Sequence, residues 1–192
     1  MKNIKKILEL HALFLAGEGG ECADFSGENL EAANFSGANL RNANFSGAIL
    51  NCANFKGAQL QDSNMQDAEL RHADLRHANL RRANCSGSDM QDADLRHANL
   101  RDANLHRGSF SRTDFSGAWL RNADFSGAWL RGANMLRADL RKANLRDADL
   151  QGVDLRHAFL RFADLNGANL KDADLRLADL SNANFRNANF SA

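Results

Sequence analysis

Three sets of side chains that could do chemistry recur at intervals of twenty residues, or at multiples of twenty. They are Cys52, His72 and Asp92; His77, His97 and His157; and Arg41, Arg81, Arg101, Arg121, Arg141 and Arg161. The first set contains metal-ligand types, the second contains groups that exchange protons near neutral pH, and the third could hold an anion. Which chemistry applies depends on how the chain positions these side chains.

The chain has a regular repeat of five residues. Every fifth residue from Phe25 to Phe190, here called a centre, is Leu, Phe, Met or Cys, which gives 34 consecutive pentads without a change of register. Alanine lies two positions before the centre in 28 of the pentads, and the residue between them is usually Asn or Asp. An α-helix would scatter the centres around its axis, and a flat strand would place successive centres on opposite faces. The chain must therefore turn a corner in every pentad.

Right-angled corners would close one coil with four pentads. Coils of this kind stack as parallel strands about 4.8 Å apart, and the 34 pentads give about 8.5 coils. Ten of the 14 glycines lie two residues after a centre, where their backbone freedom suits a corner. The absence of proline agrees with this stacking, because each coil must donate its N–H groups to a neighbouring coil.

Runs such as Ala-Asn-Phe-Ser-Gly at 33–37 and Ala-Asp-Leu-Arg-His at 73–77 carry a resemblance that extends over residues 23–192. In this stretch the chain resembles the pentapeptide-repeat family. The resemblance implies an all-β fold, a right-handed quadrilateral parallel β-helix, with the centres stacked in a dry core. The handedness is implied by the resemblance and not by the spacing.

The first twenty residues lack the repeat. Apolar residues and one histidine fall on one face at helical spacing, namely Ile4, Ile7, Leu8, His11 and Leu15. Glycines at 17, 19 and 20 supply a stop. We predict a short capping α-helix with its linker over residues 1–20 and the β-helix over residues 21–192, because a repeat rod needs cover for its apolar end.

An enzyme is not predicted. Catalysis needs a concave site with convergent groups, and an unbroken rod has no long loop to build one. Zinc ligands must converge on one point, whereas the column of Cys52, His72 and Asp92 would stand parallel on a convex corner. We therefore expect no catalytic residue, no metal and no cofactor. Three cysteines are also too sparse for a disulfide framework.

Positive and negative charges are equal in number over the whole chain, but they are distributed unevenly among the four predicted sides of the rod. Lys and Arg number 24, as do Asp and Glu, which excludes a polybasic nucleic-acid binder and a uniformly acidic DNA mimic. The side with centres every twenty residues from Leu40 to Leu180, the Leu40 side, carries +4, and the side from Phe35 to Leu175, the Phe35 side, carries +1. The other two sides carry −2 and −3. A nucleic-acid partner is not favoured, since a net charge of +4 on one side, without interleaved tyrosines, is weak evidence for nucleic-acid binding.

The file of six arginines on the Leu40 side would repel itself by roughly 1 kcal/mol per neighbouring pair unless the side chains splay or an anion binds. Large apolar residues point outward nearby, in the C-terminal half. Aromatic residues beside arginine are typical of an interface core. The predicted partner-binding residues are Trp119, Phe159, Phe162, Leu136, Leu177, Arg121, Arg141 and Arg161. Ile49 and Trp129 stand apart from this group.

The C-terminal end of the rod has no predicted lid. The last core layer, with Leu180, Phe185 and Phe190, is left without cover beside an open strand edge. Such an edge invites pairing, and we predict an end-to-end homodimer through it. Members of the resembled family form dimers through this end.

These observations favour a non-catalytic interaction or scaffold protein that presents a rigid surface to a protein partner. The alternative comes from a subgroup of the resembled family whose members bind DNA gyrase or topoisomerase IV as duplex mimics and protect against quinolones. The weak negative charge of two sides does not favour it. No stretch approaches the roughly 18 apolar residues of a membrane span, and we expect a cytoplasmic protein.

Overall fold

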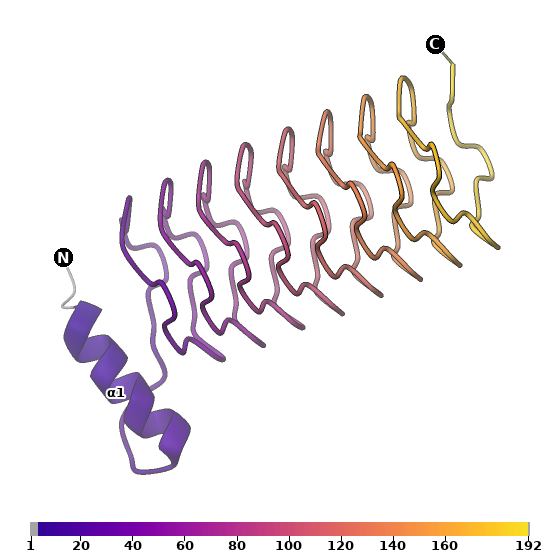
Figure 1. The fold of residues 1–192 in the computed structure, drawn as a ribbon. Coiled ribbons are helices and arrows are strands. Elements are labelled where there is room, and N and C mark those ends of the chain that lie inside the picture. Colours follow the sequence, from indigo (N-terminus) through magenta and orange to yellow (C-terminus); the bar gives the residue numbers. More distant parts are fainter. Residues whose placement is uncertain (1–3, 192) are drawn as a thin grey trace.

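The computed structural model describes residues 4–191 as one helix followed by a stack of coils. Helix α1 spans Ile4–Ala16 and lies at the end of the stack where the first coil begins, while the C-terminus lies at the opposite end (Figure 1). Parallel bridges join residues that are twenty apart, from Asp24 with Asn44 to Asn169 with Asn189. The pentads predict this interval of twenty residues, because four pentads make one coil. The hand of the coil and the number of coils stay predictions.

Each backbone N–H group of the pentad at residues 43–47 donates a hydrogen bond. Ala43 donates across the turn to the preceding centre, and Asn44 donates to the preceding coil. Phe45 and Gly47 donate to the following coil, at 2.7 Å or nearer for Phe45. The remaining N–H, that of Ser46, donates to the Asn44 side-chain Oδ1 at 3.1 Å. The recurrent Asn or Asp thus caps the one amide that the coils leave unpaired, which is why the repeat requires it.

Every corner from Gly27 to Asn187 has a positive φ at the residue two after the centre. Ten of these residues are glycine and 23 are not, including Ala32 at 55° and Leu177 at 60°. A positive φ at the third residue is what a type II turn requires. Since this conformation costs about 1–2 kcal/mol for a residue with a Cβ, the stacking of the coils, and not the corner residue, fixes the backbone there.

The core is a column of centres and alanines that is almost fully buried from Ala23 to Leu170. Phenylalanine rings pack closely in its first coils, with the Phe25 and Phe45 centroids 5.0 Å apart. The last layer is only partly covered, and Phe190 is 51% exposed. The buried column of centres and alanines that the pentads predict therefore runs as far as Leu170.

Helix α1 covers the other end of the core. Ile4, Ile7 and Leu8 pack against the buried cluster, and the fully buried His11 accepts a hydrogen bond from the backbone N–H of Ala23 through Nδ1 at 3.0 Å. Burial lowers the pKa of His11. The predicted capping helix is thus present. No helix within residues 4–191 is long and apolar enough to cross a bilayer.

Candidate partner-binding surface

A shallow pocket on the Leu40 side brings together part of the predicted partner-binding set. Trp119 bridges to Asp139 and Asp139 bridges to Phe159, so the two aromatic residues stand in one column with a carboxylate between them. The pocket measures about 290 Å³ and is lined by Gly117, Trp119, Arg137, Asp139, Arg141 and Phe159. Three residues of the predicted set, Trp119, Arg141 and Phe159, therefore share one site.

The floor of this pocket is a closed ion pair. Arg141 donates to both carboxylate oxygens of Asp139, from Nε at 2.7 Å and from Nη2 at 2.6 Å. The Asp139 side chain is only 13% exposed. Burial acts to raise the pKa of Asp139, but the hydrogen bonds from Arg141 outweigh it and hold the pKa below its ordinary value. The pocket floor is therefore polar, planar and already satisfied.

The arginine file relieves its repulsion by splaying. Arg141 turns to Asp139, Arg101 lies over the Trp119 ring with its guanidinium carbon 4.5 Å from the ring centroid, and Arg161 lies 5.6 Å above the Phe162 ring. Each of these arrangements aims a guanidinium at a carboxylate or a ring face, which are favourable partners. For Arg101, Arg141 and Arg161 the structure therefore shows splaying, one of the two alternatives that the sequence left open.

A second hollow on the same side is strongly cationic. It measures about 310 Å³ and is lined by Arg81, Arg101, Asp102, Arg121 and Asn122. Arg81 reaches Asp102 only at 3.5 Å, and Arg121 forms no ion pair with any residue that the structure describes. Nε of Arg101 is buried and has no hydrogen-bond partner in the described chain. The lining of this hollow thus contains three arginines and one carboxylate, that of Asp102.

The other predicted residues lie outside these two hollows. Leu136 is half-buried on the Phe35 side, and Phe162 is exposed at a corner with a φ of 61°. Leu177 is 78% exposed. It lines a separate shallow pocket with Arg156, His157 and Arg176. The predicted set is thus divided: three residues share one pocket, Arg121 lines the cationic hollow, and the other four lie elsewhere.

Three exposed aromatic residues occupy the position that the repeat usually gives to Asn or Asp, and that Ile49, Gln59, Glu69 and Ser109 also occupy. They are Trp119, Phe159 and Trp129, which are 48%, 48% and 60% exposed. Where Asp139 keeps the consensus, its Oδ1 accepts from the Arg141 amide at 3.3 Å. The amides that would be capped at the aromatic positions, those of residues 121, 131 and 161, have no acceptor in the described part of the chain. Each aromatic residue therefore replaces a structural hydrogen bond with exposed apolar surface.

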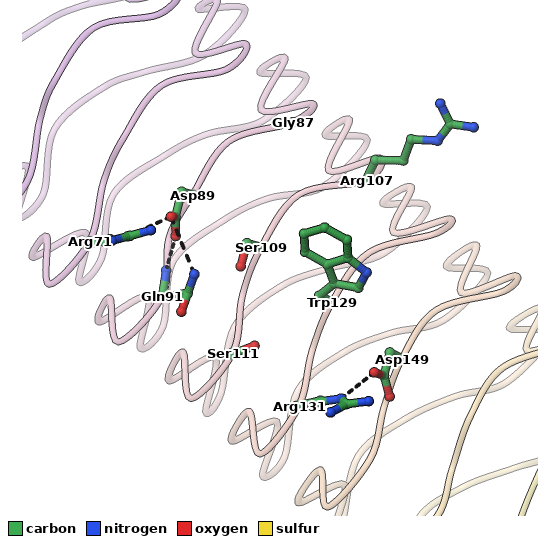
Figure 2. Close-up of a pocket in the computed structure, with 10 residues that line it drawn as sticks. All are labelled: Arg71, Gly87, Asp89, Gln91, Arg107, Ser109, Ser111, Trp129, Arg131 and Asp149. Atoms are coloured by element: carbon green, nitrogen blue, oxygen red, sulfur yellow. Dashed lines mark hydrogen bonds and ion pairs between the residues drawn. The ribbon is translucent and has the colours of Figure 1, made fainter.

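Trp129 lines a pocket of its own, which the sequence reasoning missed. This pocket lies on the side with centres from Leu30 to Phe190 and measures about 540 Å³. Figure 2 shows the Trp129 ring near Ser109 and Ser111, between the Arg71–Asp89 and Arg131–Asp149 ion pairs. The other lining residues are Gly87, Gln91 and Arg107. The available signal was the adjacent pair Ser109 and Trp129, since both depart from Asn or Asp in one column.

The histidine column singled out in the sequence is partly stacked. His77 and His97 stack with centroids 5.3 Å apart, and Gly117 follows them in the column. Within residues 4–191, no group of three or more His, Cys, Asp or Glu side chains is placed to hold a metal ion. Burial raises the pKa of the Cys85 thiol to about 12.

A family model described as pentapeptide repeats matches the chain in eight copies. The matched residues are 29–67, 68–107, 109–147, 118–156, 143–182 and 156–191. The chain belongs to the pentapeptide repeat family. In this pentapeptide repeat protein, the three aromatic residues replace the side chain that usually caps the turn. This replacement, in addition to their exposure, distinguishes them from other surface residues.

Solved pentapeptide repeat proteins are similar to this chain. Full-length QnrB1, a plasmid-mediated fluoroquinolone resistance protein, is 19% identical with a TM-score of 0.56, over 88% of this chain and 85% of QnrB1. HetL, involved in heterocyst differentiation regulation in the cyanobacterium Nostoc sp. strain PCC 7120, is 29% identical with a TM-score of 0.45, over 98% and 95%. A thylakoid lumen protein from Arabidopsis thaliana is 37% identical with a TM-score of 0.43, over 56% and 71%. The QnrB1 match shows a shared fold, and no curated protein matches significantly.

Proposed function

We propose that this pentapeptide repeat protein is a non-catalytic interaction or scaffold protein, a right-handed four-sided rod of about 8.5 coils that presents its Leu40 side to a protein partner. The observation that carries the proposal is the pair Trp119 and Phe159, which stand in one column where the repeat usually places a capping Asn or Asp. Departures from a local structural rule are expected at functional sites.

Energetic arguments support a binding role for this pair. Aromatic residues dominate interface energetics, and arginine is the other side chain enriched at hot spots. Both types line the Trp119–Phe159 pocket. The N–H and C=O groups of both aromatic residues are hydrogen-bonded to neighbouring coils, so little backbone ordering free energy is lost when a partner binds. A cytoplasmic location belongs to the proposal, because it would keep the three free thiols reduced.

A capture experiment tests the proposal. Immobilised wild-type protein and the double variant Trp119→Ser/Phe159→Ser are incubated with lysate of the native organism, and retained proteins are compared by mass spectrometry. Trp129→Ser is the matched control, because it removes an exposed aromatic residue from the same repeat position on another side. We expect the double variant to lose a partner that the control retains. An unchanged set of retained proteins, with all variants folded by circular dichroism, contradicts the proposal.

The C-terminal end is proposed as a homodimer interface. Leu180 and Phe185 are only partly buried in the last layer, and the Phe185 and Phe190 rings touch with centroids 5.6 Å apart. The amides of these three centres find no backbone acceptor among the described residues. A second copy placed end to end would cover the rings and pair the amides.

Modulation of DNA gyrase or topoisomerase IV is the second candidate. The fold shared with QnrB1, a fluoroquinolone resistance protein, favours it. The surface charge does not, since no side carries the strong negative charge that mimicry of a duplex needs. Supercoiling by purified gyrase, measured with and without quinolone at low micromolar protein, separates the candidates. Inhibition of supercoiling or relief from the drug would support the second candidate over the first.

A further inference from the structure

We propose that the Leu40 side binds an extended acidic peptide that carries an aromatic residue three positions from its acidic group. The acidic group would lie on Arg81, Arg101 and Arg121, and the aromatic ring would insert between Trp119 and Phe159. The inference rests on the proposed function and names the chemistry of the partner.

The cationic hollow has the features of a carboxylate site. Its three arginines come from successive coils, and its single carboxylate, that of Asp102, lies 3.5 Å from Arg81 and already accepts from the Asn122 side-chain amide at 2.9 Å. The Arg101 guanidinium lies over the Trp119 ring, while Arg101 Nε is buried with no acceptor in the described chain. A buried donor without a partner is costly. An incoming carboxylate would draw the Arg101 side chain outward and pair this donor, and its charge would lower the repulsion among the arginines.

The aromatic pocket has the width for one ring. Trp119 and Phe159 belong to coils two apart, so their backbones are separated by roughly 10 Å, about twice the spacing of stacked ring centroids. The Asp139–Arg141 pair at the floor is satisfied and demands no further charge. Arg137 also lines the pocket, and its charge disfavours an inserted cation. An aromatic side chain therefore suits the pocket better than lysine or arginine.

The separation of the two hollows sets the spacing in the ligand. Arg101 lies in the middle of the cationic hollow, and Asp139, at the floor of the aromatic pocket, lies two coils farther along the rod. Two coils span roughly 10 Å. A polyproline II segment rises about 3.1 Å per residue and repeats its face every three residues. Residues three apart in such a segment therefore present both groups to the rod at the required distance.

Fluorescence anisotropy with defined peptides tests this inference. The probes are fluorescein-labelled peptides with a glutamate pair and one phenylalanine on an alanine–proline background, with the phenylalanine one, three or five residues from the pair. We expect the spacing of three to bind at least threefold more tightly than the others and to weaken as salt rises. Replacement of the glutamates by lysine should abolish binding.

Arginine variants test the cationic hollow directly. Arg101→Gln should weaken binding about tenfold or more, as expected for loss of a charge-assisted hydrogen bond. Arg41→Gln is the matched control, because Arg41 belongs to the same file but its Nε donates to Gln61 at 3.4 Å, away from the hollow. In a Trp129→Phe background, Trp119 is the sole strong fluorophore of a chain that has two tryptophans and no tyrosine. Unlabelled peptide should shift its emission.

Specific results overturn the inference. They are no binding up to millimolar peptide, affinity independent of spacing, or equal affinity for the Arg101 and Arg41 variants. Any of these outcomes leaves the proposed function standing if the Trp119→Ser/Phe159→Ser double variant still loses a captured partner. If that variant loses none while the peptides bind as expected, the surface binds acidic peptides but the proposed protein partner is contradicted.

Discussion

Asn84 is the position at which the stabilising effect of the repeat's asparagine can be measured. Its Oδ1 accepts from the Ser86 amide at 3.3 Å and from the Ser86 hydroxyl at 2.8 Å. It also accepts from Asn104 at 3.0 Å, and the Asn84 amide donates to Asn64 at 3.2 Å. At about 0.5–1.5 kcal/mol for each hydrogen bond, and with partial replacement by water, Asn84→Ala should destabilise the protein by about 2–3 kcal/mol.

Asn34→Ala is the matched comparison. Asn34 is exposed and accepts only from the Ser36 amide, at 3.0 Å. Its replacement should cost about 0.5–1 kcal/mol. For a chain of this size, 1 kcal/mol shifts the melting temperature by about 2–4 °C. Thermal unfolding followed by circular dichroism should therefore show a fall of roughly 5–10 °C for Asn84→Ala and about 4 °C at most for Asn34→Ala.

Equal shifts for the two variants would refute the reasoning. They would mean that the side-chain ladder between coils adds nothing to the single turn cap. The result also bears on the binding surface, because Trp119 and Phe159 occupy the position of these asparagines. The larger the effect at Asn84, the more stability the chain forgoes to present the two aromatic residues.

Three further predictions concern the two ends of the rod and one corner. Because burial lowers the pKa of folded His11 below the ordinary value of about 6.5, the unfolded chain binds more protons, and stability should fall as pH drops below about 6.5. Denaturant unfolding at several pH values measures this. Phe190→Asp should convert a dimer to a monomer by light scattering. Gly117→Ala should destabilise by about 2 kcal/mol in thermal unfolding, since its φ is +64° and its Cβ would lie 2.6 Å from the His97 Nδ1 atom.

Each of these predictions has its own control. His11→Gln should flatten the acid slope relative to wild type, and an unchanged slope would assign it to other groups. A wild-type protein that is already monomeric at micromolar concentration contradicts the end-to-end dimer. Gly152→Ala meets no atom within 4 Å at a similar φ of +66°, so a loss equal to that of Gly117→Ala would show that the contact with the histidine is unimportant.

The sequence predicted the coil interval, the buried column and the capping helix from few residue types. A spacing of five that runs from Phe25 to Phe190 requires a corner in every pentad to keep every centre on the inside, so the pattern constrains the backbone strongly. The backbone conformation of the corners was harder to predict from the sequence. Glycine was the visible signal, yet residues such as Ala32 take the same positive φ, because closing and stacking the coils imposes the angle regardless of side chain.

The sequence also predicted which residues lie on the Leu40 side, because residues twenty apart share a column. The sequence alone therefore determined that Trp119 and Phe159 stand in one column beside a file of arginines. Only the tertiary structure decided that Arg101 turns onto Trp119 and that Arg141 closes on Asp139. It likewise decided that Trp129 lines a separate pocket. The physical reason is that the strict repeat fixes where each side chain starts, whereas the direction of a long side chain depends on charges and rings in neighbouring coils.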